Sequence, residues 1–521
     1  MHDQITIKLR LDHNVTYVDG RLSGSVYKEF KKALGYYPEG SMWMIENVRK
    51  KKEKAQLLGQ KTKYFGEWDG LISTVCYSKE HCKCFKPKSG THFPTGLISK
   101  AIHFFKDYDI NYTIEDIRNK YEMCPDILSM SSDYESRDYQ EEVVQKALKR
   151  TRGVIQMATG SGKTPVAADI ISKIGLFPVV FYVTSKDLLW QAKSELERFI
   201  LKDGKNIEVG VIGDGKKDIK DINIITVQTS VVALGGTYKK FDDEDRKQQV
   251  EDFYKNDNEI INLIKNAKVM VADEIQHWAS ETCQMISDAS ENCQYKFGIS
   301  ATVFRDLNDD ILIEGCFGKK IIDINASYLI KKKYLVKPEI LFVHIDNMKK
   351  SKYRKYTDIY KYGIVHNDLR NNWIKDIVKT LSEQNRNILI LCKQIKHGNI
   401  LESLIPNSFF LHGSHSNKQR KEHLDKMREN KVNITIASVI FDEGINVKSL
   451  DSLVLAGAGK SQTRALQRIG RTLRSYPGKE NAIIIDFYDD CKFLRDHSEK
   501  RRKIYMTEPE FIIKDAYQKR E

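Results

Sequence analysis

The sequence lacks the features that would place the protein in a membrane or in an oxidising compartment. No apolar run approaches the roughly 20 residues that a membrane-spanning helix needs. The opening MHDQITIKLRLDH does not have the basic-then-apolar layout of a signal peptide. The 9 cysteines are odd in number and scattered along the chain, unlike the disulfide framework of a small secreted domain. We therefore expect a protein of the reducing cytoplasm.

Internal repeats and low-complexity tracts are also absent from the sequence, so we expect most of the chain to be folded. The hydrophobic fraction of 41% and the charged fraction of 30% are typical of soluble globular domains. At about 100 to 200 residues per domain, the length predicts three or four of them. The formal net charge of +14 favours a polyanionic partner, because neutralised phosphates release condensed counterions. Charge alone does not separate DNA, RNA and an anionic membrane.

From about residue 133 the chain alternates short apolar runs with amphipathic stretches. Runs such as VVFYV and AIIIDF are apolar throughout, which predicts parallel strands covered on both faces. The fold class expected is α/β, with two doubly wound parallel-sheet domains preceded by a small α+β N-terminal domain. The expected limits are 1–128 for the N-terminal domain, 129–330 and 331–490 for the two α/β domains, and 491–521 for a C-terminal helical tail.

The segment MATGSGKT lies directly after a predicted strand and before a predicted helix. Glycines let backbone N–H groups approach a phosphate chain closely, and the N-terminal end of a helix attracts the anion. Lys163 is expected to reach the β and γ phosphates, and Thr164 to hold Mg²⁺. Met157 replaces the usual first glycine of this pattern. The residues expected to contact ATP here are Met157, Ala158, Thr159, Gly160, Ser161, Gly162, Lys163 and Thr164.

The segment VMVADEIQH places two carboxylates at the end of another apolar strand. A carboxylate in this position binds Mg²⁺, and a second one beside it orients and deprotonates the attacking water. We assign Asp273 to the metal and Glu274 to the role of base. Adjacent acidic residues are common on protein surfaces, but the preceding apolar strand and the following His277 favour a catalytic pair.

The segment QRIGRTLR, from 467 to 474, lies in the second α/β domain. An arginine supplied from a facing domain stabilises the charge that develops on the γ-phosphoryl group. Arg471 and Arg474 are the candidate fingers, with Gln467 beside them. Their spacing predicts that both arginines share one face of a helix, which a solvent-exposed basic stripe would also show.

The motifs together resemble those of superfamily 2 helicases, over about 133 to 490. The chain looks most like the tailed-phage UvsW branch-migration helicases, and FGEWDG and FPTGLISKAIHFF extend the similarity into the N-terminal part. The ordered motifs are RDYQ (137–140), ATGSGKT (158–164), VTSKDLLWQ (183–191), TVQTS (226–230), DEIQH (273–277), SAT (300–302), FDEGIN (441–446) and QRIGRTLR (467–474).

The resemblance implies two RecA-like domains and assigns further residues. Asn446 occupies a position where aspartate is common in the family. His277 is the expected partner of the coupling residues. The adenine-reading residues would be Arg137, Tyr139 and Gln140. The DNA-backbone contacts would be Thr184, Ser185, Thr226, Gln228 and Ser438. The residues that couple hydrolysis to strand movement would be Ser300, Ala301, Thr302 and Arg305. The second-domain nucleotide contacts would be Gly444 and Asn446.

The N-terminal part carries weaker candidates for DNA contact and for zinc. A basic cluster and Trp68 are candidate DNA contacts, although basic runs are often solvated and an aromatic beside glycines often caps a small core. A zinc site is left open, because Cys82 and Cys84 are only two apart and a second CxxC pair is missing. The basic residues are Arg49, Lys50, Lys51 and Lys52, and the possible zinc ligands are Cys76, His81, Cys82 and Cys84.

The resemblance predicts an ATP- and Mg²⁺-dependent DNA helicase or translocase, monomeric and 3′ to 5′ in polarity. Its expected role is the remodelling of forks and Holliday junctions in recombination, repair or replication, in a bacteriophage and therefore in the host cytoplasm. An RNA helicase or RNA-stimulated ATPase shares every motor motif. The motor subunit of a restriction system is the other alternative. A passive binding module would not need Lys163, Glu274 and Arg471 together.

Overall fold

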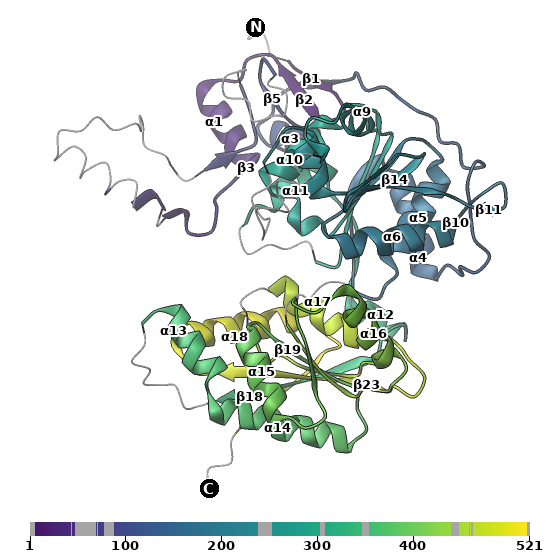
Figure 1. Cartoon of the computed structure of the whole chain (residues 1–521). Helices are drawn as coiled ribbons and strands as arrows, with labels where there is room; N and C mark the ends of the chain where they lie inside the picture. Colours follow the sequence, from purple (N-terminus) through teal and green to yellow (C-terminus); the bar gives the residue numbers. More distant parts are fainter. Residues whose placement is uncertain are drawn as a thin grey trace. The chain divides into compact units, whose positions relative to one another are not determined.

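A computed structural model provides the structure of the 521-residue chain (Figure 1). Two compact units make up the chain: unit 1 comprises Met1–Gln156 and Gly162–Asp323, and unit 2 comprises Met157–Ser161 and Ile324–Glu521. Within the described residues, no helix is long and apolar enough to span a bilayer. The residues that the structure describes are 6–42, 44–46, 50, 69, 71–77, 88–237, 253–302, 308–345, 354–438, 447–457, 459 and 462–517.

Unit 1 is built on an eight-stranded sheet that is parallel across its centre. Because the central strands are buried on both faces, their sequences are almost entirely apolar. The parallel pairs join β12 to β14, β14 to β9, β9 to β15, β15 to β16 and β16 to β8, whereas β13 is antiparallel to β12. In spatial order the strands are β13 (Lys216–Asp218), β12 (Val209–Gly213), β14 (Ile222–Thr226), β9 (Val179–Val183), β15 (Val269–Asp273), β16 (Tyr295–Ser300), β8 (Arg152–Met157) and β17 (Lys320–Ile324).

Helices surround this sheet, and their apolar faces form the core of the unit. Helix α9 contributes Ile260, Leu263 and Ile264 to that core. A small sheet of β7 (Ser129–Met130), β10 (Ile200–Lys202) and β11 (Lys205–Asn206) lies beside it. The helices are α4 (Asp138–Leu148), α5 (Lys163–Ile174), α6 (Lys186–Phe199), α7 (Val227–Ala233), α9 (Asn258–Asn266), α10 (Glu281–Ala289) and α11 (Asp310–Phe317), with the 3-10 turn η3 (Ile275–His277).

The N-terminal part of unit 1 is a small α+β layer, drawn in purple in Figure 1. Its core is aromatic: Phe30 packs against Phe93, Phe104 and Phe105. The sheet has the order β5-β2-β1-β6, with β1 antiparallel to β2 and parallel to β6. The elements are β1 (Ile7–Leu11), β2 (Val15–Asp19), α1 (Gly24–Ala33), β3 (Gly35–Tyr36), β4 (Ile72–Ser73), β5 (His92–Pro94), η2 (Thr95–Leu97), α3 (Ile98–Asp107) and β6 (Tyr112–Asp116).

Buried polar contacts dock this N-terminal layer onto the large sheet. Lys296, on β16, is fully buried and donates to Asn14 Oδ1 at 2.5 Å and to Ser287 O at 3.1 Å. Asn14 in turn donates to Asp288 O at 2.8 Å, and Arg152, on β8, donates to His13 O. Both cations lie near the amino ends of their strands. Because an unpaired buried charge is costly, these bonds fix the layer to the sheet.

Unit 2 is a second α/β sandwich around a seven-stranded, fully parallel sheet. The core lies between the sheet and its helices, and includes Ile374, Ile390 and Phe487. In spatial order the strands are β20 (Phe409–Leu411), β21 (Ile434–Ser438), β19 (Ile388–Cys392), β22 (Ser452–Val454), β23 (Asn481–Asp489), β18 (Lys337–Ile345) and β24 (Ile512–Ala516). The helices are α12 (Ala326–Lys331), α13 (Tyr356–Tyr360), the π-helix η4 (Lys361–Val365), α14 (Asp368–Glu383), α15 (Ile395–Leu404), α16 (Asn417–Arg428), α17 (Gln462–Thr472) and α18 (Lys492–Tyr505).

Both sheets confirm the predicted α/β class, but the structure corrects two local expectations. The C-terminal segment is not wholly helical, because β24 follows α18 and pairs in parallel with β18. Arg474 does not share a helix face with Arg471. Helix α17 ends at Thr472, and Arg474 forms a β-bridge with Leu335.

The buried amine of Lys296 predicts a pH-dependent stability. Burial lowers the pKa of Lys296 from 10.5 to about 8, so between those pH values the unfolded chain binds more protons than the folded one. The free energy of unfolding should therefore rise with pH through this window, by about 1 to 3 kcal/mol relative to a Lys296→Met variant. Urea unfolding of both proteins at about pH 7.5 and about pH 10 measures this. An identical pH dependence in the two proteins would contradict it.

Candidate functional site

The phosphate-binding loop predicted from the sequence connects β8 to α5. Gly160 and Gly162 have φ angles of 86° and 82°, in the left-handed region that favours glycine. A Cβ on Gly162 would lie 2.4 Å from Gln140 Nε2, so a side chain there would displace the Gln140 amide. Helix α5 begins at Lys163, immediately after this turn, and its N–H groups open onto the carboxyl end of a parallel strand. Such a loop is an anion site suited to phosphates.

The two predicted carboxylates follow β15 at the same edge of the sheet. Glu274 Oε1 lies 4.0 Å from Lys163 Nζ, and both side chains are 18% exposed. Glu274 has left-handed backbone angles, φ 51° and ψ 52°, and its N–H donates to Asp273 Oδ1 at 2.9 Å. Burial, together with the charge of Glu274, raises the pKa of Asp273 to about 7, against the opposing charge of Lys163.

This cluster fits Mg²⁺, because carboxylate and hydroxyl oxygens are the ligands that this ion prefers. Asp273 and Thr164 are the residues that would hold it. A bound dication would favour the ionised form of Asp273 and would neutralise phosphate charge. Glu274 remains beside Lys163, where its carboxylate can accept a proton from water.

A chain of side-chain hydrogen bonds connects this site to the end of β16. Gln276 Nε2 donates to Glu274 Oε2 at 2.7 Å, and Ser300 Oγ donates to Gln276 Oε1 at 2.6 Å. The N–H of Thr302 donates to Ser300 Oγ at 3.2 Å. The sequence predicts His277 as the partner of Ser300 and Thr302, whereas the hydrogen bond of the Ser300 hydroxyl is to Gln276. His277 lies in the same turn, η3. These hydrogen bonds connect Glu274, the predicted base, to Ser300 and Thr302, two of the predicted coupling residues.

The predicted adenine-reading residues lie at the start of α4, beside the phosphate loop. Gln140 is 3% exposed, and its Oε1 accepts from the N–H of Arg137 at 3.0 Å and from the hydroxyl of Tyr134 at 2.9 Å. Arg137 donates to the hydroxyl of Tyr139 at 2.9 Å. These bonds orient the Gln140 amide so that its nitrogen faces Gly162. Tyr134 is a further residue of this element, and its position six residues before Gln140 gave no signal in the sequence.

The predicted nucleic-acid contacts of unit 1 follow the neighbouring parallel strands β9 and β14. Ser185 and Thr226 are the N-caps of α6 and α7, so their hydroxyls fix the helices that leave this edge. Gln228 donates to Thr184 O at 2.7 Å. Thr184 Oγ1 and Gln228 Oε1 are buried and have no hydrogen-bond partner among the described residues. Because the strands are parallel, these side chains share an edge of the sheet with the phosphate loop.

In unit 2, Ser438 ends β21, and Gln467 and Arg471 lie on α17. The Ser438 hydroxyl is buried and unbonded within the described part of the chain. In unit 1, Lys50 is exposed and pairs with Glu46 at 2.6 Å, and Cys76 is buried. No metal-binding group of three or more ligands occurs among the residues described. The predicted residues outside the described ones are Arg49, Lys51, Lys52, Trp68, His81, Cys82, Cys84, Arg305, Gly444 and Asn446.

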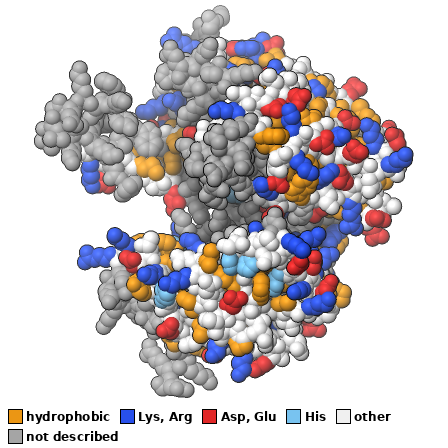
Figure 2. All heavy atoms as spheres, viewed as in Figure 1, with side chains coloured by type: hydrophobic (Ala, Val, Ile, Leu, Met, Phe, Trp, Pro, Cys, Tyr) orange, Lys and Arg blue, Asp and Glu red, His pale blue; other side chains and the backbone are white. Residues whose placement is uncertain are grey.

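The described surface is mixed in charge. On the face that Figure 2 shows, Lys and Arg side chains are interleaved with Asp and Glu over both units. Many of the basic side chains are paired, for example Lys186 with Asp214 and Lys193 with Glu197. The net charge of +14 is therefore not expressed as one continuous basic field on this face.

One edge of the unit 1 sheet carries a phosphate loop, a carboxylate pair and the hydrogen bonds that run from Glu274 to Ser300. A second α/β unit follows and carries Arg471 on α17. Together these features define an ATP-driven nucleic-acid motor. Residues 133–305 match the family described as "Type III restriction enzyme, res subunit", and residues 369–476 match "Helicase conserved C-terminal domain". The chain belongs to the superfamily 2 helicases and is an ATP-dependent helicase similar to UvsW.

Three curated relatives show the extent of the similarity. The "Putative helicase 22" of Sulfolobus islandicus filamentous virus is 25% identical over 70% of this chain and 66% of its own length. The "DNA 3'-5' translocase XPB2" of Sulfurisphaera tokodaii is 24% identical over 71% and 84%. The "ATP-dependent DNA helicase uvsW" of Enterobacteria phage T4 is 23% identical over 82% and 83%.

Among solved structures, a putative HsdR subunit of a type I restriction enzyme from Vibrio vulnificus YJ016 shares the fold. The TM-score is 0.52 at 16% identity, and the match covers 90% of this chain and 82% of that one. This likeness extends to the fold alone.

Removing the Gln276 amide should interrupt the hydrogen bonds between Glu274 and Ser300. ATP hydrolysis should then no longer respond fully to nucleic acid. In Gln276→Ala the base Glu274 loses its connection to Ser300, and a bond to a charged group contributes about 1.5 to 3 kcal/mol. We expect nucleic-acid-stimulated kcat to fall about tenfold or more, with KM for ATP within about twofold. The control is Gln284→Ala, which removes another partly buried glutamine that donates to Trp278 O in the same unit. Equal kcat in the two variants would show that the hydrogen bonds through Gln276 do not couple Glu274 to Ser300.

Proposed function

We propose that this protein is a DNA helicase and translocase that remodels branched DNA, moving 3′ to 5′ along one strand. ATP is bound by the loop from Met157 to Thr164. Lys163 contacts the phosphates, Asp273 holds Mg²⁺, and Glu274 is the base. Arg471, on α17, is the finger that stabilises the charge developing on the γ-phosphoryl group. Arg474 follows this helix in the sequence.

The observation that carries this proposal is the shared edge of the unit 1 sheet. Five strands of one parallel sheet end at it, and each is followed by residues predicted to form the phosphate loop, the carboxylate pair, the coupling element or the strand contacts. The bonds from Lys163 through Glu274 and Gln276 to Ser300 give hydrolysis a structural route to the coupling residues. A motor that must ignore base sequence is expected to use backbone contacts of this kind.

Buried polar atoms support a nucleic-acid track at the predicted positions. The hydroxyls of Thr184 and Ser438 and the carbonyl oxygen of Gln228 are buried without a hydrogen-bond partner among the described residues. An unsatisfied buried polar atom costs about 1 to 3 kcal/mol, so such atoms are rare unless a ligand completes them. A phosphate or ribose group can accept from the hydroxyls of Thr184 and Ser438.

The N-terminal layer supports a branched substrate. The described residues of the two α/β domains include no feature that we can assign to recognition of a branch point, and the layer is the remaining element of domain size. The similarity to the uvsW protein of phage T4 covers 82% of the chain, against 71% for the archaeal translocase, and therefore reaches beyond the motor. Because Asn14 and Lys296 fix the layer to unit 1, it would present its DNA contacts in a constant geometry relative to β8 and β16. The protein would work as a monomer.

Two alternatives make different predictions for substrates. An RNA helicase would show ATPase activity stimulated most by structured RNA. A restriction motor, a class to which some structural relatives belong, would act on linear duplex DNA together with a nuclease subunit. Neither alternative gives the N-terminal layer a reason to recognise a junction.

An ATPase assay across substrates tests the proposal. We expect stimulation by forked and four-way DNA to exceed that by single-stranded DNA, duplex DNA and structured RNA, because branch contacts add to backbone contacts. Strongest stimulation by RNA would overturn the assignment to DNA.

Neutralising the basic cluster tests the part played by the N-terminal layer. Replacing Lys50, Lys51 and Lys52 together with Ala should remove most of the preference for branched DNA and flatten its salt dependence, since fewer phosphates are neutralised. The matched control replaces Lys28, Lys31 and Lys32, which lie on α1 of the same layer. A truncation at 128 would instead uncover Lys296, so point variants give the cleaner result. Equal loss in both triple variants would contradict a specific role for the cluster.

A further inference from the structure

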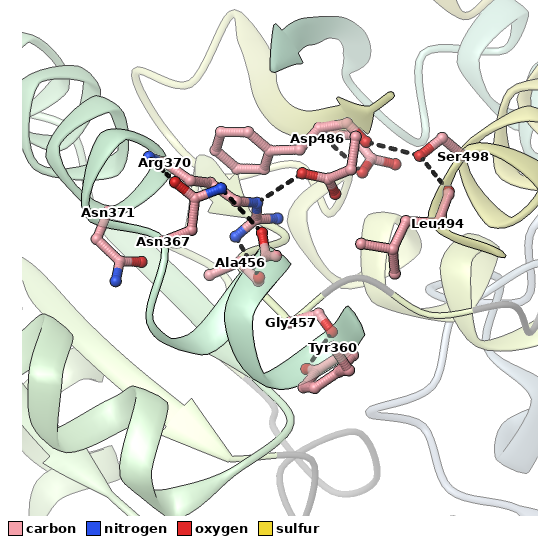
Figure 3. Close-up of polar contacts among 12 residues, drawn as sticks. Tyr360, Asn367, Arg370, Asn371, Ala456, Gly457, Asp486, Leu494 and Ser498 are labelled. Carbon is pink, nitrogen blue, oxygen red and sulfur yellow. Dashed lines mark hydrogen bonds and ion pairs between the residues drawn. The ribbon is translucent and has the colours of Figure 1, made fainter. Parts of the chain in front are cut away.

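Three buried side chains from three helices donate hydrogen bonds to the loop that follows β22. The hydroxyl of Tyr360 donates to Gly457 O at 2.7 Å, and Arg370 Nη1 donates to Ala456 O at 2.7 Å. Arg501 Nη1 donates to Gly459 O at 2.8 Å. In Figure 3 the Arg370 side chain reaches Ala456, and Tyr360 lies beside Gly457. The carbonyls of Ala456, Gly457 and Gly459 are thereby held by side chains.

Carboxylates on β23 fix the two arginines. Arg370 is 0% exposed and donates through Nε to Asp489 Oδ1 at 2.9 Å, and its guanidinium lies 4.2 Å from the ring centroid of Phe487. Arg501 makes a bidentate pair with Asp486, at 2.8 and 2.9 Å. A buried guanidinium requires such a partner, because an uncompensated charge in the interior is strongly destabilising. With one edge of each fork tied to β23, the other edge is aimed at the loop.

The loop is also confined from the opposite side. A Cβ on Gly457 would lie 2.7 Å from the N of Lys393, at the end of β19, so the backbone packs directly against that strand. Helix α17 begins at Gln462, three positions after Gly459, and carries Gln467 and Arg471. The position of the loop therefore sets the starting point of the arginine helix.

We propose that Tyr360, Arg370 and Arg501 are positioning residues for hydrolysis: they hold the carbonyls of Ala456, Gly457 and Gly459 and thereby set the placement of α17 and its arginine finger. This inference rests on the role of Arg471 stated under the proposed function. A transition-state contact tolerates little displacement, and a shift of about 1 Å can cost about a hundredfold in rate. None of the three residues needs to touch ATP for this effect.

The test compares two tyrosines that make the same bond in different units. Tyr360→Phe removes a hydroxyl that donates to a backbone carbonyl in the clamp, and Tyr254→Phe removes one that donates to Lys216 O at 2.8 Å in unit 1. Both tyrosines are at most 2% exposed, so the two variants should lose similar thermal stability. We expect kcat of the DNA-stimulated ATPase to fall at least about fivefold in Tyr360→Phe only, with KM for ATP within about twofold.

The same substitution in an Arg471→Ala background separates positioning from general stability. If the clamp acts through the finger, Tyr360→Phe should lower kcat little further once the finger is absent, which is a non-additive result. A kcat in Tyr360→Phe equal to that of Tyr254→Phe would overturn the proposal, as would an undiminished effect in the Arg471→Ala background. If Tyr360→Phe does not fold, Arg370→Lys, which keeps the charge but loses the fork, gives the same comparison. A wild-type kcat in Arg471→Ala alone would instead refute the finger assignment.

Discussion

The buried charge at the ends of the parallel strands is the constraint on which the rest of the structure depends. Asp273 and Glu274 lie together in a partly dehydrated site, where burial raises the pKa of Asp273 to about 7. Two carboxylates in this position favour a nearby cation, and Lys163 Nζ lies 4.0 Å from Glu274 Oε1. Bound phosphates and Mg²⁺ would bring further charges of both signs, so we expect the site to be most stable when it is loaded. Affinity for ATP·Mg²⁺ and the need to compensate buried charge have the same physical origin.

The same constraint explains how the flanking parts are fixed. Lys296 and Arg152 bring cations to the opposite ends of β16 and β8, and each has a partner in the N-terminal layer, Asn14 for Lys296 and His13 for Arg152. In unit 2, Arg370 and Arg501 take their carboxylates from β23 and use the remaining donors to hold the loop before α17. In each case a buried cation makes one part of the chain depend on the exact position of another. Such contacts tolerate displacement less well than apolar packing does, because their energy depends strongly on direction.

Much of the motor could be predicted from the sequence, because each motif follows an apolar run and parallel strands place their carboxyl ends together. The α/β class and the superfamily were confirmed, and Lys163 does lie beside Glu274. The roles of the individual site residues and the domain limits stay predictions. Local rules failed where a long-range contact decides the structure. Asn14 meets Lys296 across 282 positions, and Arg370 meets Asp489 across 119. The periodicity of apolar residues in the sequence does not predict such pairs. The final strand β24 was not predicted for the same reason.

The most direct measurement of the central claim follows the dissociation of a synthetic four-way DNA junction into its duplex products. Wild-type protein with ATP and Mg²⁺ should resolve the junction, and the same protein with a non-hydrolysable ATP analogue should bind it without resolving it. Lys163→Ala should behave with ATP as the wild type does with the analogue, since it keeps the DNA contacts and loses the phosphate contact. Two results would contradict a motor that uses ATP hydrolysis to remodel branched DNA. One is dissociation of the junction by Lys163→Ala at the wild-type rate, and the other is an intact junction with wild-type protein and ATP.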